Sequence, residues 1–438
     1  MLLRQFVDAD LGCASYLLAD EETRDAVVVD PAFAIEPFLE QAERDDLRLV
    51  RVLETHTHAD HVSGHGRLAL ELGLPVHVHP EARPEYPFEP LADGQELAVG
   101  NSAIKILHTP GHRPEHCCFV SDDAVLTGDS LFVGSVARPD LAVEAREGAE
   151  GLFHSLQRLL ELPDAFRVYP GHVAGSLCGT GMSGDPSSTI GAERRENPAL
   201  AHTLVGEFVD ASATASSPRP PNMARVVEIN RGPFVGAPPS LGLVEDAAGA
   251  TILDVRSGRD FSAGHVPGAL NVPVSASMFG TRAGFLLNPD ERVVLYAGSR
   301  AEAEDAAAKL RAVGFLELEG YVTDAAATAR LEPVSLDELE RLLGEDAEVI
   351  DVREREEWAD GYIAGTRNIP YRLVRTFVDS VPRDRPVVTV CESGARASLA
   401  ASVLAAAGIA ARPVLDAGVT AWKESGRPLV EFSRCGDR

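Results

Sequence analysis

Residues 55–61 concentrate side chains that commonly bind metal ions. They read THTHADH and include His56, His58, Asp60 and His61. Imidazole and carboxylate groups are typical ligands of zinc and of non-heme iron. An apolar run at 49–53 precedes the segment. We therefore expect a strand at 50–53 that ends in a metal-binding loop, because α/β folds place their chemistry at the carboxyl ends of strands.

Three later motifs place a His or Asp beside glycine. They are HTPGH (108–112), LTGDSLF (126–132) and VYPGH (168–172), and they contribute His112, Asp129 and His172. Apolar patterns predict further strands at 26–29, 75–79, 124–126 and 166–169, and a helix at 150–160. Twelve of the thirteen histidines lie between His56 and His202. Metal chemistry is therefore expected in the first half of the chain.

In this order, the four motifs resemble those of the metallo-β-lactamase superfamily over about residues 1–230. The resemblance implies an αββα sandwich with metal at its rim. In a two-metal site, one ion would be held by His56, His58 and His112, the other by Asp60, His61 and His172, and Asp129 would bridge them. Two zinc ions would make the domain a hydrolase similar to glyoxalase II.

The same residues also resemble those of persulfide dioxygenases, which use one Fe(II) ion. That resemblance implies that His56, His112 and Asp129 hold the iron as a facial triad, with open positions for a persulfide and O2. The other ligand-type residues would then surround the iron or mark a vestigial second metal position: His58, Asp60, His61 and His172. The motifs do not distinguish this site from the two-zinc site.

Segments outside the motifs favour the dioxygenase. Arg138-Pro139-Asp140 resembles the segment after the aspartate in that family, and YPGHVAGSLCG with residues 187–200 resembles bacterial fusions to rhodanese modules. The resemblance implies that Cys178 handles persulfide near the metal. It also implies that Arg138, Asp140, Arg194 and Arg195 contact the thiol substrate.

The second half contains a repeat. Residues 252–273 and 349–370 align at one offset of 97 (351 − 254), and the identities at this offset include Asp254 and Asp351, Gly268 and Gly365, Asn271 and Asn368, Pro273 and Pro370. We expect two duplicated domains of about 100 residues, at 236–331 and 332–438, after a proline-rich linker at 216–223. Strand and helix patterns alternate in each copy, which predicts doubly wound parallel sheets in an α/β fold.

A cysteine loop, CESGARAS, occupies residues 391–398 of the second copy. A strand pattern at 387–390 precedes Cys391 and an alanine-rich helix pattern follows. Backbone N–H groups and the helix dipole stabilise a thiolate and an anion at such a position. Gly394 permits the tight loop, and Arg396 supplies a positive charge suited to sulfite or thiosulfate. The spacing resembles that of rhodaneses, which implies a persulfide on Cys391.

The first copy has no such nucleophile. Its corresponding loop reads LYAGSRAEAE, and no cysteine lies between Cys178 and Cys391. We therefore expect this copy to be catalytically inactive and to act as a spacer or an interface. Cys117 and Cys118 lie in an apolar run that predicts a buried strand, and Cys13 and Cys435 are assigned no function.

The hypothesis is a persulfide dioxygenase fused to a sulfurtransferase. One Fe(II) per chain would oxidise a low-molecular-weight thiol persulfide with O2 to sulfite, and Cys391 would convert sulfite to thiosulfate, for sulfide detoxification. A dizinc thioester hydrolase fused to rhodanese modules is the alternative, and a non-enzymatic sulfur carrier is a third. The sequence leaves the thiol open between glutathione, coenzyme A and others.

The charge and composition of the chain limit the classes of partner that we expect. The formal net charge is −27, which disfavours nucleic acid and anionic membranes as partners. The sequence shows no signal-peptide pattern and no long apolar run, so a cytoplasmic location is expected. The six cysteines are sparse and irregularly spaced, which is typical of reduced thiols. The family resemblance suggests a homo-oligomer.

Overall fold

The computed structural model describes residues 1–173, 182–213, 218–245, 247 and 249–431. The chain forms two compact units. One comprises Met1–Pro238 with Arg311–Leu316, and the other comprises Pro239–Leu310 with Glu317–Arg438. No helix in these described ranges is long and apolar enough to cross a membrane.

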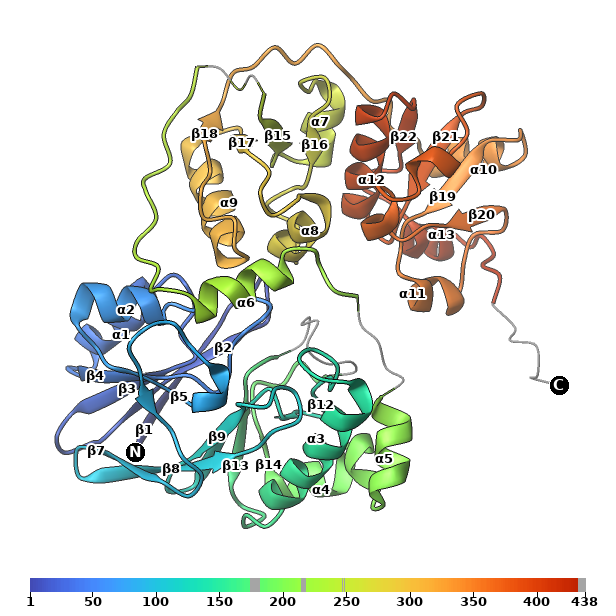
Figure 1. Ribbon diagram of the computed structural model, residues 1–438. Helices are drawn as coiled ribbons and strands as arrows, with labels where there is room; N and C mark the ends of the chain where they lie inside the picture. Colours follow the sequence, from blue (N-terminus) through green and yellow to red (C-terminus); the bar gives the residue numbers. More distant parts are fainter. Residues whose placement is uncertain (174–181, 214–217, 246, 248, 432–438) are drawn as a thin grey trace. The chain divides into compact units, whose positions relative to one another are not determined.

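Two six-stranded sheets form the centre of the first unit (Figure 1). The first sheet has the order β1-β2-β3-β4-β5-β6, with bounds Leu2–Val7, Ala14–Ala19, Asp25–Val29, Arg48–Leu53, Val76–Val78 and Glu89–Pro90. The second has the order β14-β13-β10-β9-β8-β7, with bounds Ser188–Thr189, Arg167–Pro170, Ala124–Gly128, Cys117–Val120, Ser102–His108 and Glu96–Val99. A hairpin of β11 (Leu131–Phe132) and β12 (Ser135–Val136) follows Asp129.

Helices α1 (Glu36–Arg44) and α2 (His65–Leu72) cover the outer face of the first sheet, and α3 (Ala145–Leu159), α4 (Ile190–Glu196) and α5 (Val205–Ser212) pack outside the second. Helix α6 (Met223–Arg231) packs through Val226 against Phe33 and Val62. Leu18 of β2 packs between the sheets with Phe119 of β9, whereas the preceding residue, Leu17, packs outward with Phe38 of α1. Successive side chains of a strand point to opposite faces, so each buried strand joins two cores. The predicted αββα sandwich is confirmed.

The second unit contains two four-stranded parallel sheets. The first copy has the order β16-β15-β17-β18 (Leu270–Asn271, Thr251–Asp254, Val293–Tyr296, Gly320–Val322), with helices α7 (Gly258–Ala263), α8 (Phe279–Leu286) and α9 (Arg300–Ala312). The second copy has the order β20-β19-β21-β22 (Thr366–Asn368, Glu348–Asp351, Val387–Val390, Ala411–Pro413), with α10 (Leu336–Leu343), α11 (Arg355–Ala359), α12 (Ala395–Ala406) and α13 (Val419–Glu424).

The repeated residues have the same structural role in both copies. The Asn271 amide donates to the backbone carbonyls of Asp254 and Arg256, at 2.9 and 3.0 Å. The Asn368 amide donates to the carbonyls of Asp351 and Arg353, at 3.0 and 2.9 Å. The asparagine thus joins two neighbouring parallel strands in each copy, which is why the repeat retains it together with the strand-end aspartate.

Some predicted bounds differ from the structure. The helix predicted at 150–160 begins earlier, at Ala145, because Gly148 and Ala149 pack in the interior. The strands predicted at 75–79 and 166–169 are Val76–Val78 and Arg167–Pro170. The predicted linker at 216–223 ends inside a helix, since Met223 is the first residue of α6 and is buried.

Candidate metal centre and cysteine loop

Three of the predicted ligands converge at one edge of the sandwich. His56 follows β4, His112 follows β8, and Asp129 directly follows β10. The Oδ2 atom of Asp129 lies 3.5 Å from Nε2 of His112 and 3.9 Å from Nε2 of His56. One ligand atom from each of the three residues lies within 4.8 Å of the others, and all three residues are buried.

Each of the three residues is oriented by a hydrogen bond to the side-chain atom that points away from the other two residues. The Nδ1 atom of His56 lies 2.9 Å from the Thr55 hydroxyl, and Nδ1 of His112 donates to the Arg138 carbonyl at 2.9 Å. The Oδ1 atom of Asp129 is bonded to Nδ1 of His172 at 2.8 Å. Among the described residues, Oδ2 of Asp129 has no hydrogen-bond partner. A divalent metal ion fits between a buried carboxylate oxygen and two imidazoles whose other ring nitrogens are held by hydrogen bonds.

The surroundings favour the protonation states in which these three side chains can bind a metal ion. Burial, with the charge of His58, holds the pKa of His56 well below its usual range, and burial also lowers the pKa of His112. Burial alone would raise the pKa of Asp129, but His172 outweighs it and the pKa lies below the usual range. The site therefore presents two neutral imidazoles and one carboxylate, which is the donor set of a non-heme Fe(II) facial triad.

His58 does not join this triad. Its Nε2 atom lies 3.2 Å from Oε2 of Glu54 and 3.3 Å from Oδ1 of Asp30. Burial disfavours a charge on His58, but Asp30 and Glu54 outweigh it and raise its pKa well above the usual range. Burial likewise opposes ionisation of Glu54, yet His58 and His65 lower its pKa to about 2. His58 is thus part of a buried ionic cluster.

The other ligand-type residues form a second group. His172 bonds Asp129 through Nδ1 and Asp60 through Nε2, the latter at 2.7 Å. The Cys13 thiol donates to Oδ2 of Asp60 at 3.0 Å and lies 3.3 Å from Nε2 of His172. Both ring nitrogens of His61 are buried and have no hydrogen-bond partner in the described part of the chain. Burial favours neutral His172, but Asp129 and Asp60 outweigh it and raise its pKa to about 10.

Several residues at the site were not identified in the sequence. Asp30 follows a predicted strand, so the strand-end rule that found Asp129 could have found it. Asn230 of α6 donates its amide to the carbonyls of His58 and His61, at 3.0 and 2.8 Å, and so holds the THTHADH loop. Nothing local in the sequence marks Cys13 or Asn230, because each lies far along the chain from the loop it contacts.

The predicted substrate residues are placed differently from one another. The Arg138 guanidinium is buried and bonds both carboxylate oxygens of Asp140, at 2.7 and 2.8 Å. Arg194 and Arg195 are exposed on α4. Arg194 bonds Asp164 and the Leu160 carbonyl. Their contact with a thiol substrate stays a prediction, and Cys178 lies outside the described residues.

The predicted cysteine loop connects β21 to α12. Cys391 directly follows β21, and Gly394 is the N-cap residue of α12. The Gly394 N–H donates to Sγ of Cys391 at 3.1 Å, and Gly394 has φ of +109°, a conformation that L side chains rarely adopt. The Glu357 carboxylate accepts hydrogen bonds from both terminal nitrogens of Arg396, at 2.5 and 2.7 Å. The loop thus combines a thiol, a helix N-terminus and a fixed cation.

The corresponding loop of the first copy has an alanine in place of the cysteine and binds a carboxylate. In the parallel register, Tyr296 ends β17 as Val390 ends β21, so Ala297 stands where the second copy has Cys391. The N–H of Gly298 donates to the Glu302 carboxylate at 2.6 Å. The Glu302 carboxylate thus accepts a hydrogen bond from this loop, and the inactivity of this copy stays a prediction.

Family profiles match both halves of the chain. The profile described as "Metallo-beta-lactamase superfamily" matches residues 9–172, and the profile described as "Rhodanese-like domain" matches residues 242–324 and 335–425. The crystal structure of a metallo-beta-lactamase from Staphylococcus aureus subsp. aureus COL superimposes with a TM-score of 0.68 at 28% identity, over 74% of this chain and 98% of that chain. That similarity extends beyond the first unit.

Named relatives match the first half. "Persulfide dioxygenase ETHE1, mitochondrial" of Bos taurus is 32% identical over 251 residues, covering 55% of this chain and 91% of that protein. The human protein of the same name is 31% identical, covering 52% and 87%. "Probable polyketide biosynthesis zinc-dependent hydrolase BaeB" of Bacillus velezensis is 31% identical, covering 38% and 76%. This chain belongs to the metallo-β-lactamase superfamily as a homologue of the ETHE1 persulfide dioxygenases, and it carries two rhodanese-like domains.

Proposed function

We propose that the first half is a non-heme Fe(II) persulfide dioxygenase with one iron per chain, held by His56, His112 and Asp129. The observation that carries the proposal is the convergence of those three donors while His58 pairs with Asp30 and Glu54. Similarity to the ETHE1 persulfide dioxygenases supports it. The substrate is a low-molecular-weight thiol persulfide.

The overall reaction balances without a further reductant. One persulfide (RSSH), one O2 and one water give one thiol (RSH), one sulfite and two protons. The bound iron would supply adjacent positions for the persulfide sulfur and O2. The protein's part is to hold two imidazoles neutral, to fix them through Thr55 and the Arg138 carbonyl, and to keep the site buried.

The second half would then consume the sulfite. Cys391 takes sulfane sulfur from a second persulfide and carries it as a cysteine persulfide. The sulfite sulfur attacks the outer sulfur, the bond between that sulfur and Sγ breaks, and thiosulfate leaves while the thiolate returns to Cys391. The Gly394 N–H and the N-terminus of α12 stabilise this thiolate. Linking production of reactive sulfite to its removal suits sulfide detoxification in the cytoplasm.

One observation favours the hydrolase alternative. The ring nitrogens of His61 and Oδ1 of Asp60 have no hydrogen-bond partner in the described chain, so a second ion could bind there, as in a two-zinc hydrolase. Protein purified without air and analysed for metals separates the two functions. One iron per chain with O2 uptake on adding glutathione persulfide supports the dioxygenase. Two zinc ions with acyl-glutathione hydrolysis would overturn it. A panel of thiol persulfides then identifies the thiol.

Replacement of His58 by glutamine tests the role of this residue. We expect the iron content to stay near one per chain, because His58 is outside the triad, whereas a two-zinc site would lose an ion. Unfolding should become easier by about 3–5 kcal/mol, because Glu54 and Asp30 would be buried without their cation. The raised pKa makes this contribution full below about pH 6.5 and lost as the pH rises through the folded value.

Metal analysis and denaturant unfolding at several pH values measure both effects. His154→Gln, on the same domain but on α3, is a control with no expected effect on either. Loss of iron from the His58 variant while it remains folded would contradict the three-residue site.

A further inference from the structure

The first rhodanese-like copy, which we call the cysteine-free copy, contributes residues to the first unit. The segment Arg311–Leu316 belongs to that unit, whereas the residues on both sides of it belong to the other. It comprises the end of α9 and the loop that follows. Leu316 packs with the buried side chains of Phe33, Val62 and Val226. A short stretch of the second half is therefore part of the domain that carries the candidate metal centre.

The segment accepts a hydrogen bond from the backbone just after the THTHADH loop. The Val62 N–H donates to the Ala312 carbonyl at 2.7 Å, and Val62 is buried. Ala312 is the last residue of α9, and the last carbonyls of a helix have no partner within that helix. A buried N–H group without an acceptor is unfavourable, so this bond fixes the chain at the residue that follows His61.

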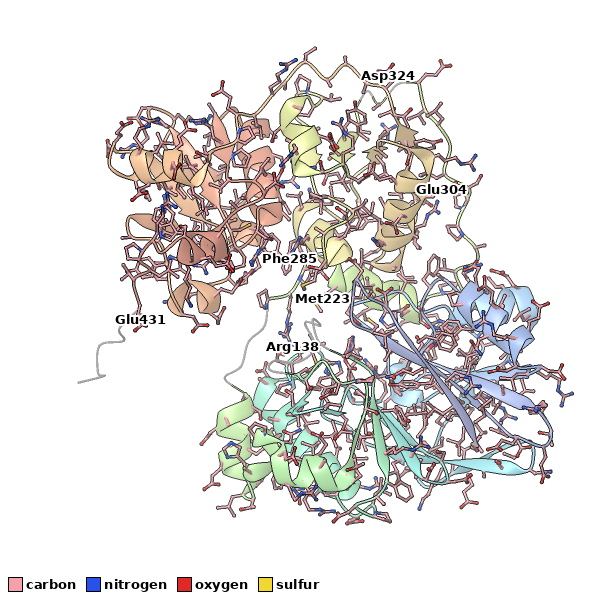
Figure 2. The ribbon with its side chains drawn as sticks, turned by 180° about the vertical axis from the view of Figure 1, so that it is seen from behind. Arg138, Met223, Phe285, Glu304, Asp324 and Glu431 are labelled. Carbon is pink, nitrogen blue, oxygen red and sulfur yellow. The ribbon has the colours of Figure 1, made fainter. Side chains whose placement is uncertain are left out.

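The start of helix α6 also holds the segment. Its first residue, Met223, is labelled in Figure 2, and Asn222 directly precedes it. An asparagine at this position commonly accepts a hydrogen bond from its own helix, but the buried Asn222 side chain does not. Its amide instead donates to the Val313 carbonyl at 2.7 Å. A Cβ atom on Gly314 would lie 3.1 Å from Cγ2 of Val226, so the segment and α6 are in close contact.

The other end of α6 holds the THTHADH loop. The Asn230 amide donates to the carbonyls of His58 and His61, and its Oδ1 atom accepts the Ser63 N–H at 2.8 Å. Asn230 is buried. Helix α6 and the segment therefore hold neighbouring backbone groups at the same end of the loop.

This end of the loop supports one of the candidate metal ligands. Oδ2 of Asp60 lies 2.7 Å from Nε2 of His172, and Nδ1 of His172 lies 2.8 Å from Oδ1 of Asp129. Asp60 directly precedes His61, whose carbonyl Asn230 holds. A shift of the loop at this point would move Asp60, and with it the hydrogen bonds that orient Asp129. Such outer partners of a metal ligand influence metal affinity strongly.

We propose that the segment Arg311–Leu316 is a positioning element of the metal centre, so that the cysteine-free copy supports the chemistry of the first half. The segment holds the end of the THTHADH loop directly and through α6. This assigns a role to a domain that has no nucleophile of its own. The inference rests on the proposed metal site and adds the element that maintains its geometry.

Amide hydrogen exchange of the full-length protein tests whether the segment holds the loop. Asn222→Leu keeps a side chain of similar size but removes the bond to Val313. Peptides that cover residues 58–63 should then exchange about tenfold faster, whereas peptides that cover β9 should not change. Gly314→Ala should have the same effect, because its Cβ atom would press on Val226.

Gly408→Ala is the matched control for Gly314→Ala. Gly408 follows α12 as Gly314 follows α9, and both have positive φ, at +78° and +93°. A Cβ atom on Gly408 would lie at an ordinary contact distance, 3.6 Å, from the Arg383 guanidinium. The two variants therefore share the backbone strain but not the contact with α6. Gly408→Ala should leave exchange in residues 58–63 unchanged.

Release of bound metal to a chelator tests the positioning role itself. Asn222→Leu should release iron about tenfold faster while the protein stays folded, and Gly408→Ala should not. Unchanged exchange in residues 58–63, equal acceleration in all peptides of the first unit, or faster local exchange without faster metal release would overturn the proposal. If the unsubstituted protein binds zinc and no iron, the proposed dioxygenase fails, while the rate of zinc release still decides the role of the segment.

Discussion

Replacement of Asp129 by alanine is expected to abolish iron binding and persulfide-dependent O2 uptake. Asp129 supplies the only carboxylate of the three convergent donors, and its Oδ2 atom is the one closest to both imidazole nitrogens. Loss of a supporting partner typically costs about 10- to 100-fold in metal affinity or activity, so loss of the ligand itself should exceed this. Iron analysis of protein purified without air and an oxygen electrode measure the two losses.

Two further variants show whether the effect of Asp129→Ala comes from loss of a metal ligand. Asp129→Asn keeps the shape of the side chain and should also lose iron, which separates ligand loss from a packing defect. Asp123→Ala removes an exposed aspartate of the same domain and should retain iron and O2 uptake. Sulfur transfer from thiosulfate to cyanide should survive in all three, because Cys391 belongs to the other unit. Full O2 uptake by folded Asp129→Ala would refute the proposed iron site.

Replacement of Cys391 by serine should convert the product of the complete reaction from thiosulfate to sulfite. A serine hydroxyl cannot carry sulfane sulfur, so transfer should fall at least about a thousandfold. Each O2 consumed should then yield one sulfite, and the rate of O2 uptake should stay unchanged, because the proposed iron ligands lie in the first unit. Product analysis of sulfite and thiosulfate, run beside the oxygen electrode, measures this change.

Ser393→Ala supplies the control within the same loop. Ser393 is exposed and two residues from the nucleophile, so this variant should still form thiosulfate. Continued thiosulfate formation by Cys391→Ser would mean that another thiol carries the sulfur, and the assignment of this loop would be wrong.

The sequence by itself determined the fold class and the metal and cysteine motifs. Each motif is local: an apolar strand ends, and the chemical residues follow at once, as His56 follows β4 and Cys391 follows β21. Ligand-type residues beside strand ends predicted a metal site, because α/β folds place their chemistry at the carboxyl ends of strands. That His56, His112 and Asp129 form the triad was implied by the family resemblance. The repeat at one offset similarly predicted two equivalent sheets.

Only the tertiary structure decided which ligand-type residues join the candidate triad and which pair with other charged side chains nearby. His58 is two residues from His56, yet Asp30 and Glu54 take it into a separate ionic cluster. Cys13 reaches Asp60 across 47 positions of the chain, and Asn230 reaches the THTHADH loop from α6. Local patterns describe which residues share a strand or helix face, whereas these contacts depend on how distant elements pack. The contact of Phe285 on α8 with Tyr371 of the second copy arises in the same way.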